Sequence, residues 1–440
     1  MLEEIGKEEI NIGKSSNQPI FRTDIDYDIL SKQREEAISK WNSLSPADRA
    51  IYQDQRDYES KNNVPNLKDE TLIPAKNVSL MMREIRERIN TNDVLRLLPL
   101  EGLDFDDSAL ELAESLENTE EIRDLYRVRK RTTGNKKNSG ISTDEAAKLK
   151  NCFSQGRELY LAGRQGSLMV KPLNFFYALT AYSYGVIILN NPLRFRKDML
   201  PGSHGMAYIP DAIHAQFGGD SARGTFSDLV TAFPTQLVKN NSIEFNIDCS
   251  DSIIQFYETK FSVSLGILLS MIPEMTDYYK LTTGQNSRCF PIEVVSANDP
   301  RSLIWEFHIG NGETRPSKSS IEESFKEFIH HERHGKIVVK VPASKASSIK
   351  ACIYSDLRGS LWYVENPFFP VILPEIAVHF LITSMFSNIM RYRPDEWGNV
   401  LLNEVPSGIS LLTRHYFSSF QRKFFLVILR SLSRYIPYVA

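Results

Sequence analysis

Cysteine is scarce in this sequence, and the cysteines present do not have the spacings of a metal site. The 440 residues contain no CxxC pair, and no cysteine stands at zinc-ligand spacing from a histidine. This pattern argues against a structural zinc site and a disulfide framework, and it is typical of a reducing compartment. We therefore expect a cytoplasmic location without a metal or cofactor; the four cysteines are Cys152, Cys249, Cys289 and Cys352.

Other signatures are missing as well. The chain has no GxGxxG, GxxxxGK[ST], HExxH or GxSxG motif, which removes the familiar nucleotide-binding and hydrolase fingerprints. Its net charge of -3 lacks the positive excess of a dedicated nucleic-acid binder, although local basic patches are compatible with it. The segment "MLEEIGKEEINIGK" lacks the basic start and apolar stretch of a secretory signal, so it predicts no export.

The chain divides into four segments by composition and periodicity. Residues 1–25 show little periodicity and are expected to form a mobile tail. Residues 26–126 read as a helical accessory module, in which Ser45 and Pro46 mark a helix start. A basic linker follows at 127–141, and the remaining residues, 142–440, form the main domain.

The linker sequence "RVRKRTTGNKKNSG" combines positive charge with Gly, Ser, Thr and Asn, so hydrophobic burial cannot order it. One interpretation is contact with the phosphates of RNA or DNA, because an adaptable basic run neutralises backbone charge whatever the base sequence. The alternative is a solvated linker with the usual surface charges. The candidate phosphate ligands are Arg127, Arg129, Lys130 and Arg131.

The main domain is expected to be helix-rich α+β, with long core helices packed around a small antiparallel sheet. A capping-box spacing from Ser142 to Glu145 starts the first helix, and a more apolar helix begins near Pro172. Between about 200 and 365, shorter runs predict strands, with a hairpin turning at Leu357 and Arg358. The expected strands are "GTFSDLVTAF", "SIEFNID", "SLIWEFHIG", "KIVVKVP", "KACIYSD" and "GSLWYVEN"; the interrupting helices are "SLGILLSMIPEM" and "SIEESFKEFIHHERH".

Residues 373–397, "LPEIAVHFLITSMFSNIMRYRPDEW", have almost the length of a membrane span. Pro374, Glu375, His379 and Asn388 interrupt the apolar pattern, and a charge or imidazole in lipid costs about 2.5 kcal/mol or more. We therefore predict a core helix and no integral membrane insertion. The last helix, "GISLLTRHYFSSFQRKFFLVILRSLSRY", mixes cations with apolar residues; docking on the protein core is its expected role, with a membrane surface or a partner as alternatives.

Four stretches, in the same order, resemble the YaaC-like family, a bacterial family without a firmly assigned activity. The resemblance covers residues from about 150 to 437, while the first 140 residues lie outside it. The chain departs from the family where "MAYIPDAIHAQFGGDSARG" replaces a basic run, so roles that depend on that run do not carry over. The four stretches are "GRELYLAGRQGSLMVKPLNFFYALTAYSYGVIIL", the "HG" that follows, "SLGILLSMIPEMTDYYKLTTG" and the 373–397 segment.

A fainter resemblance links "NFFYALTAYSYGVIIL" and the following "HG" to HEPN domains, many of which are ribonucleases or toxin-antitoxin parts. Cleavage in that family uses an arginine and a histidine on one helix. The matching spacing here is Arg301 to His308 in "RSLIWEFH", which alternates like a strand. A strand would not bring this pair together in the way the helix does.

Three residues are candidates for acid-base chemistry. His204 sits in "PGSHGM", where glycines could present the imidazole in a loop; a turn histidine bonded to nearby backbone is the alternative. Glu375 and His379 have i, i+4 spacing and could form a buried carboxylate-imidazole pair, against the alternative of a satisfied core histidine. His330 and His334 have the same spacing at an expected helix end, but without a third ligand they do not predict a metal site.

The end of the 373–397 segment supplies a second candidate group. Its arginines and aromatics could bind a phosphate or stack a base, whereas a helix end with dipole-compensating arginines and a core tryptophan is the alternative. These residues are Arg391, Tyr392, Arg393 and Trp397.

Two functional hypotheses follow. The first is a protein that binds or cleaves RNA or DNA, such as a HEPN-like nuclease or a defence-system component. The second is a non-catalytic interaction subunit, whose helical module and terminal helix bind a partner protein or a second copy, because no complete catalytic constellation is visible.

Overall fold

The computed structural model describes most residues from 96 to 439. The chain divides into two compact units, Met1–Asn92 and Asp93–Ala440, and the described residues belong to the second. The predicted tail and the helix start at Ser45 and Pro46 lie outside the description. The segments left out are 1–95, 101–104, 133–139, 191–199, 201, 210–212, 241–242, 296–301, 309–314, 334, 343–344, 346–347, 403, 405–406, 433–434 and 440.

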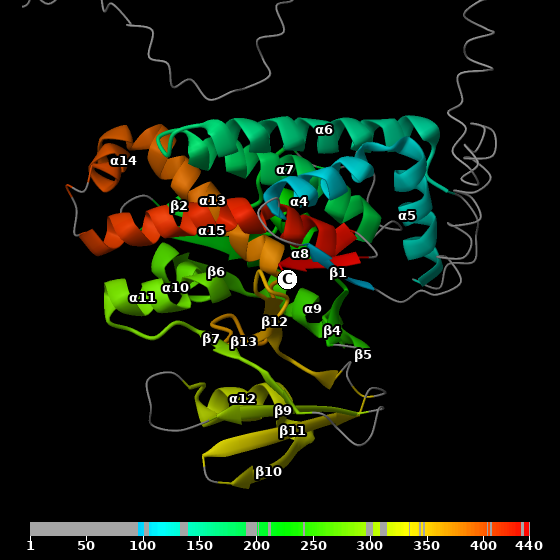
Figure 1. The fold of residues 1–440 in the computed structure, drawn as a ribbon, viewed down its shortest axis with the longest axis vertical. Coiled ribbons are helices and arrows are strands. Elements are labelled where there is room, and N and C mark those ends of the chain that lie inside the picture. Colours follow the sequence, from blue (N-terminus) through cyan, green and yellow to red (C-terminus); the bar gives the residue numbers. More distant parts are fainter. Residues whose placement is uncertain are drawn as a thin grey trace, which may run out of the picture. The chain divides into compact units, whose positions relative to one another are not determined.

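Four long helices pack together in the described unit, with α6 (Thr143–Gln165) along its edge in Figure 1. Ser142 caps the first of them by accepting a hydrogen bond from Glu145 N at 3.1 Å, as the capping box predicted. The first two of these four helices along the chain approach closely because Gly185 of the second lies against the ring of Phe153 in the first. A Cβ at Gly185 would lie 2.2 Å from that ring. The helices are α6 (Thr143–Gln165), α7 (Lys171–Asn190), α13 (Glu375–Tyr392) and α15 (Ser407–Leu432).

Two further helices, α4 (Phe105–Glu114) and α5 (Thr119–Thr132), pack near α6. Arg157 on α6 donates from Nε to Glu117 at 2.6 Å, which joins the segment between α4 and α5 to the main domain. Helix α5 continues through Thr132, so the first part of the predicted linker is helical. A parallel strand pair, β1 (Arg96–Leu100) and β14 (Tyr435–Val439), links the two ends of the described unit.

The fold class is confirmed as helix-rich α+β, but the antiparallel strands form several small sheets instead of one. One is β10-β11-β9-β8, and Phe325 of helix α12 (Lys318–Phe325) packs against its Trp305 and Phe307. The others are β12-β13-β7, β2-β3-β6 and the β4-β5 pair. The bounds are β2 (Ala207–Ile209), β3 (His214–Gly218), β4 (Thr235–Asn240), β5 (Ile243–Asp248), β6 (Lys260–Ser264), β7 (Cys289–Pro291), β8 (Glu293–Val295), β9 (Ser302–His308), β10 (Ile329–Arg333), β11 (Lys336–Pro342), β12 (Cys352–Ser355) and β13 (Leu361–Val364).

Short helices connect the sheets to the core. They are α8 (Thr225–Thr231), α9 (Ser250–Glu258), α10 (Leu265–Ser270), α11 (Thr276–Thr283), α12 (Lys318–Phe325) and α14 (Pro394–Leu401). Single 3₁₀ turns lie at η1 (Ser115–Glu117), η3 (Gly219–Ser221), η4 (Pro273–Met275) and η5 (Lys326–Phe328).

Two element predictions were wrong. The stretch "GTFSDLVTAF" is helix α8, not a strand, because Phe226, Leu229 and Val230 recur at helical spacing and are all buried. The stretch "IHHER" is strand β10, paired with β11, so the helix end expected to carry His330 is a strand, and His334 lies outside the described residues. The hairpin of β12 and β13 and the strand over "SLIWEFH" are confirmed.

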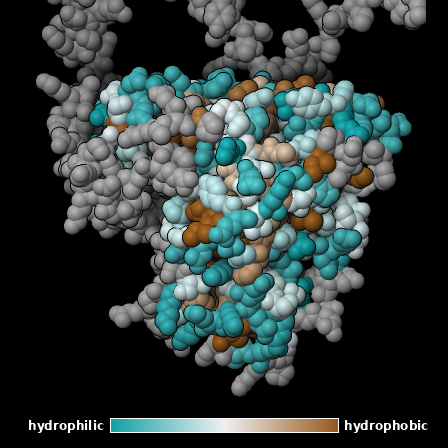
Figure 2. Space-filling model, turned by 180° about the vertical axis from the view of Figure 1, so that it is seen from behind, coloured by the Kyte–Doolittle hydropathy of each residue, from teal (hydrophilic) through white to brown (hydrophobic). Residues whose placement is uncertain are grey.

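The core prediction for the apolar helices is confirmed. Among the described helices, only α7 is long and apolar enough to cross a membrane, and 78% of that window is buried inside the protein. Helix α13 is also mostly buried, and α15 docks on the core with Lys423 and Arg430 inside it. On the face drawn in Figure 2, apolar residues form small separate patches among hydrophilic ones.

Candidate functional site

The loop that carries His204 is fixed to the start of α8. Gly205 and Gly224 have positive φ angles of 76° and 123°, and a Cβ on Gly224 would lie 2.4 Å from Gly205 N. The carbonyls of Ser203 and His204 accept hydrogen bonds from Thr225 N and Phe226 N, each at 2.9 Å. Two free N–H groups of α8 are thereby satisfied, and the backbone of His204 has a defined position.

The imidazole of His204 is half-buried beside α7. Its ring centroid lies 4.9 Å from that of Phe176 and 6.4 Å from that of Tyr177, in edge geometry. Its Nδ1 is buried and has no hydrogen-bond partner among the described residues. Burial, and then the charge of Arg391, lower the pKa of His204 below its usual value, so the ring is neutral at pH 7.

The residues predicted around Arg391 have separate environments. Arg391 donates from Nε to Ser387 O at 3.3 Å, and its guanidinium carbon lies 4.9 Å from the ring centroid of Tyr392, which is 69% exposed. Arg393 pairs with Glu396 at 2.6 Å on the first turn of α14. These two cations therefore differ: Arg391 lies against an exposed aromatic ring, and Arg393 already has a carboxylate partner.

Trp397 belongs to the core. It is 1% exposed, and its Nε1 donates to the carbonyl of Met169 at 3.1 Å. Its ring packs between Phe386 and Phe417, at centroid distances of 5.9 and 6.4 Å. A buried indole with a satisfied N–H has no free face for a base, so the structure favours the core interpretation.

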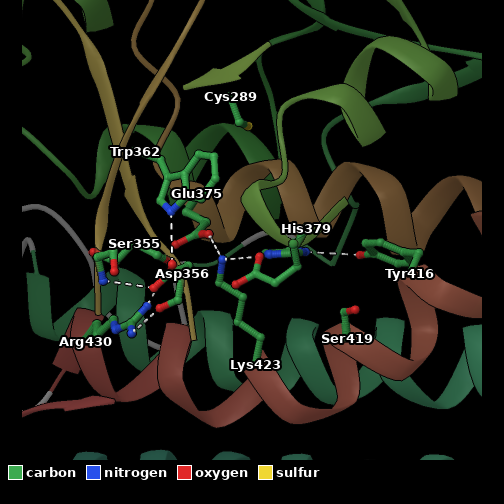
Figure 3. Close-up of polar contacts among 12 residues, drawn as sticks. Cys289, Ser355, Asp356, Trp362, Glu375, His379, Tyr416, Ser419, Lys423 and Arg430 are labelled. Carbon is green, nitrogen blue, oxygen red and sulfur yellow. Dashed lines mark hydrogen bonds and ion pairs between the residues drawn. The ribbon is translucent and has the colours of Figure 1, made fainter. Parts of the chain in front are cut away.

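Glu375 and His379 are both buried but do not bond to each other. Lys423, on α15, lies 2.5 Å from Glu375 Oε1 and 2.6 Å from Glu274 Oε2 (Figure 3). Burial alone would lower the pKa of Lys423, but the charges of Glu274 and Glu375 outweigh it and raise the pKa, so the amine stays protonated. Sequence spacing identified Glu375 as buried but missed its lysine partner.

His379 bonds to Tyr416 on α15. The distance from His379 Nδ1 to the Tyr416 hydroxyl is 3.2 Å, and the imidazole stacks on Phe420 with centroids 4.5 Å apart. Burial, and then the charge of Lys423, hold the pKa of His379 well below its usual value. His379 is therefore a neutral core histidine, which matches the alternative interpretation of the sequence.

A second buried cation stands further along α15. Arg430 donates to the carbonyls of Ser355 and Asp356 at 3.1 and 2.8 Å, and Asp356 in turn accepts from Trp362 Nε1 at 3.1 Å. Burial lowers the pKa of Arg430 below its ordinary value, against the charge of Glu375. Arg430 thus holds the β12-β13 hairpin to the core helices.

The predicted site residues therefore fall into three places. His204 and Arg391 are close enough to interact electrostatically at the surface, whereas Glu375 and His379 face α15 in the interior.

Arg127 is half-exposed on α5 and pairs with Asp124 at 2.5 Å. The backbone of Arg129, Lys130 and Arg131 belongs to α5, and their side chains lie outside the description. The described residues contain no group of three or more His, Cys, Asp or Glu arranged for a metal ion.

Comparison with known families decides where this chain belongs. Residues 114–432 match the YaaC-like protein family, which is nearly three quarters of the sequence. The chain belongs to the YaaC-like family. The match begins earlier than the resemblance predicted and includes all of α5 as well as the His204 loop, α13 and α15.

The family match does not extend to the HEPN-like resemblance, which stays a hypothesis. A search of curated proteins and a search of solved structures each found no match. Both polar groups, the surface pair of His204 and Arg391 and the interior cluster around Lys423, lie in the YaaC-like part of the chain.

The buried neutral state of His379 predicts a pH effect on stability. Because its pKa is lower in the folded chain than in the unfolded one, the unfolded state binds more protons below about pH 6.5. The contribution of His379 to the free energy of unfolding is therefore fully present above that pH. It is lost as the pH drops, by at most about 1.4 kcal/mol per pH unit.

Urea denaturation of wild type and His379→Gln between pH 5.0 and 7.5 measures this effect. The variant is expected to be less stable at pH 7.5 but to lose less free energy of unfolding on acidification than wild type. Burial raises the pKa of Glu375, so this residue makes the protein more stable as the pH falls. Wild type and His379→Gln both contain Glu375, so its effect cancels when their pH profiles are compared. Parallel pH profiles would contradict a neutral buried His379.

Proposed function

We propose that this YaaC-like protein is a cytoplasmic protein that binds the phosphates and bases of RNA or DNA at its surface. The site is an edge, here named the His204 edge, formed by Tyr177, His204, Arg391 and Tyr392. The observation that carries the proposal is that Arg391 acts electrostatically on a half-buried imidazole and also lies 4.9 Å from an exposed tyrosine ring.

The chemistry of these groups suits a nucleic acid. Arg391 can contact a phosphate through its fork of N–H donors, and Tyr392 exposes a ring on which a base can stack. Tyr177 is 37% exposed, and its ring centroid lies 6.4 Å from that of His204. A cation with two exposed aromatics is a combination found where proteins bind single strands without reading their sequence.

Cleavage is a separate question from binding. The segment with the arginine-histidine spacing of HEPN enzymes is strand β9 as far as His308 and not a helix, and Arg301 lies outside the described residues. Any hydrolysis at the His204 edge would use a neutral imidazole beside a guanidinium, as general base and phosphate ligand. We therefore propose binding as the function and treat cleavage as an outcome of the same assay.

The experiment measures fluorescence anisotropy of labelled single-stranded RNA and DNA of mixed sequence against the full chain, from low to physiological salt. Binding is expected at low salt and is expected to weaken as salt rises, because each phosphate contact contributes about -0.7 to the logarithmic salt slope. Gel analysis of the same samples reports cleavage. Absence of binding to both nucleic acids at low salt would overturn the proposal.

The interaction hypothesis is a second candidate, favoured by an apolar surface at the start of α15. Leu281 and Leu402 are 72% and 70% exposed, and Ile409 is 50% exposed. Leu281 and Ile409 lie on adjoining elements, because a Cβ on Gly408 would be 3.0 Å from the carbonyl of Thr282 on α11, and Leu402 follows α14, which also contacts α15. Exposed apolar groups gathered in this way are typical of association surfaces. The occupant proposed is a second copy of the chain.

Light scattering after size exclusion tests this second candidate. The wild type is expected to dimerise with rising concentration, and the variant Leu281→Ser with Ile409→Ser is expected to stay monomeric. Ile254→Ser, an exposed residue on α9, is the matched control and should dimerise like wild type. A monomeric wild type at all concentrations, or a heterologous partner recovered without self-association, would refute the second-copy assignment.

A further inference from the structure

Three buried side-chain atoms around Lys423 have no hydrogen bond among the described residues: His379 Nε2, Glu274 Oε1 and Glu375 Oε1. Glu375 Oε1 is ion-paired with the amine of Lys423 at 2.5 Å, which leaves His379 Nε2 and Glu274 Oε1 to explain. Buried polar atoms in folded proteins are almost always paired, with protein groups or with an ordered water. Both atoms belong to side chains around the same lysine: Lys423 bonds to the other oxygen of Glu274, and its charge acts on His379.

The contact between His379 and Tyr416 favours one tautomer of His379. The Tyr416 hydroxyl is fully buried, and burial raises its pKa well above the usual value, so it keeps its proton. A buried hydroxyl needs an acceptor, and His379 Nδ1 stands 3.2 Å from it. Nδ1 therefore accepts, and a neutral ring then carries its hydrogen on Nε2. The unpaired Nε2 is a donor, while the unpaired Glu274 Oε1 is an acceptor.

The unpaired donor is directed toward the ion pair. Figure 3 shows the imidazole of His379 between the Tyr416 hydroxyl and the amine of Lys423. Since Nδ1 faces Tyr416, Nε2 lies on the opposite side of the ring, toward Lys423. Glu274 Oε2 is 2.6 Å from that amine, and Oε1 is bonded to the same carboxyl carbon. A donor and an acceptor that complement each other are therefore present in one buried place.

We propose that a single bound water molecule bridges His379 and Glu274, accepting from Nε2–H and donating to Oε1. Charge argues for a neutral ligand, because Lys423 and Arg430 balance Glu274 and Glu375, and an added ion would leave an uncompensated buried charge. Internal waters have this role where polar groups of a folded chain would otherwise lack partners. The bridge joins Tyr416, His379, Glu274, Lys423 and Glu375 into one hydrogen-bonded chain.

A high-resolution crystal structure of the full chain, with ¹⁵N-histidine NMR, tests the bridge. Density for one water within hydrogen-bond distance of both atoms, and an Nε2–H tautomer of His379 at neutral pH, are the expected results. The proposal would be overturned by a direct bond between the two side chains, by apolar side chains that occupy the place of the water, by a bound ion, or by an Nδ1–H tautomer.

Tyr416→Phe provides an independent variant, because it removes the donor to Nδ1 and should weaken the preference for the Nε2–H tautomer. An unchanged tautomer in this variant would contradict the assignment of Tyr416 as donor. His379→Gln assigns the NMR signal. If either variant fails to fold, the wild-type density and tautomer still decide the question.

Discussion

Lys423→Met is expected to destabilise the protein by about 3–5 kcal/mol, because it leaves the carboxylates of Glu274 and Glu375 buried without a cation. Methionine has nearly the length of lysine, so the change removes charge with little loss of volume. Reversible urea denaturation at pH 7 measures the free energy of unfolding. This is the largest single-residue effect expected from the described ion pairs.

A rescue variant separates charge from packing. Combining Lys423→Met with Glu274→Gln and Glu375→Gln removes all three charges, and it should recover a substantial part of the lost stability, because replacing a whole buried ion network costs less than breaking it. The exposed pair of Lys318 and Glu332 serves as a control, since Lys318→Met should leave the free energy of unfolding nearly unchanged. A stable Lys423→Met variant would show that Lys423 is not buried as the structure has it.

Trp397→Ala is expected to lower the free energy of unfolding by about 3–5 kcal/mol, because the indole is fully buried between Phe386 and Phe417. Trp397→Phe should cost less, since it keeps most of the apolar volume and loses the bond to Met169. Urea denaturation measures both.

The same substitution distinguishes a core residue from a ligand contact. If Trp397 belongs to the core, Trp397→Phe should bind RNA with wild-type affinity under conditions where the variant is folded. A stable Trp397→Phe protein with a large loss of RNA affinity would instead place the indole in the binding surface.

Local sequence patterns determined much of the fold correctly. The capping box at Ser142 starts α6, and the hairpin turn near Leu357 joins β12 and β13. Interrupted apolar periodicity over 373–397 identified a core helix, because its polar residues are compatible with protein contacts but costly in lipid. Each of these predictions depends on residues within one or two turns of each other, which is the range that a sequence pattern reports.

Features that depend on distant residues were not predictable in this way. Lys423 lies 149 residues from Glu274, and nothing in "SSFQRKFFLVIL" distinguishes its buried amine from the exposed cations of the same helix. The signal that was present is its position on an apolar face, three residues after Phe420 and four before Val427. Strand β10 was mistaken for a helix end because its pairing with β11 outweighs the local pattern of "IHHERH".

The most direct test of the proposed nucleic-acid site compares the affinity of Arg391→Gln and of Arg358→Gln for single-stranded RNA at low salt. Both variants remove one positive charge, but Arg358 is an exposed residue in the turn between β12 and β13. Arg391→Gln should weaken binding about tenfold and reduce the logarithmic salt slope by about 0.7, while Arg358→Gln should bind like wild type. Equal affinities of the two variants would contradict RNA binding at the His204 edge.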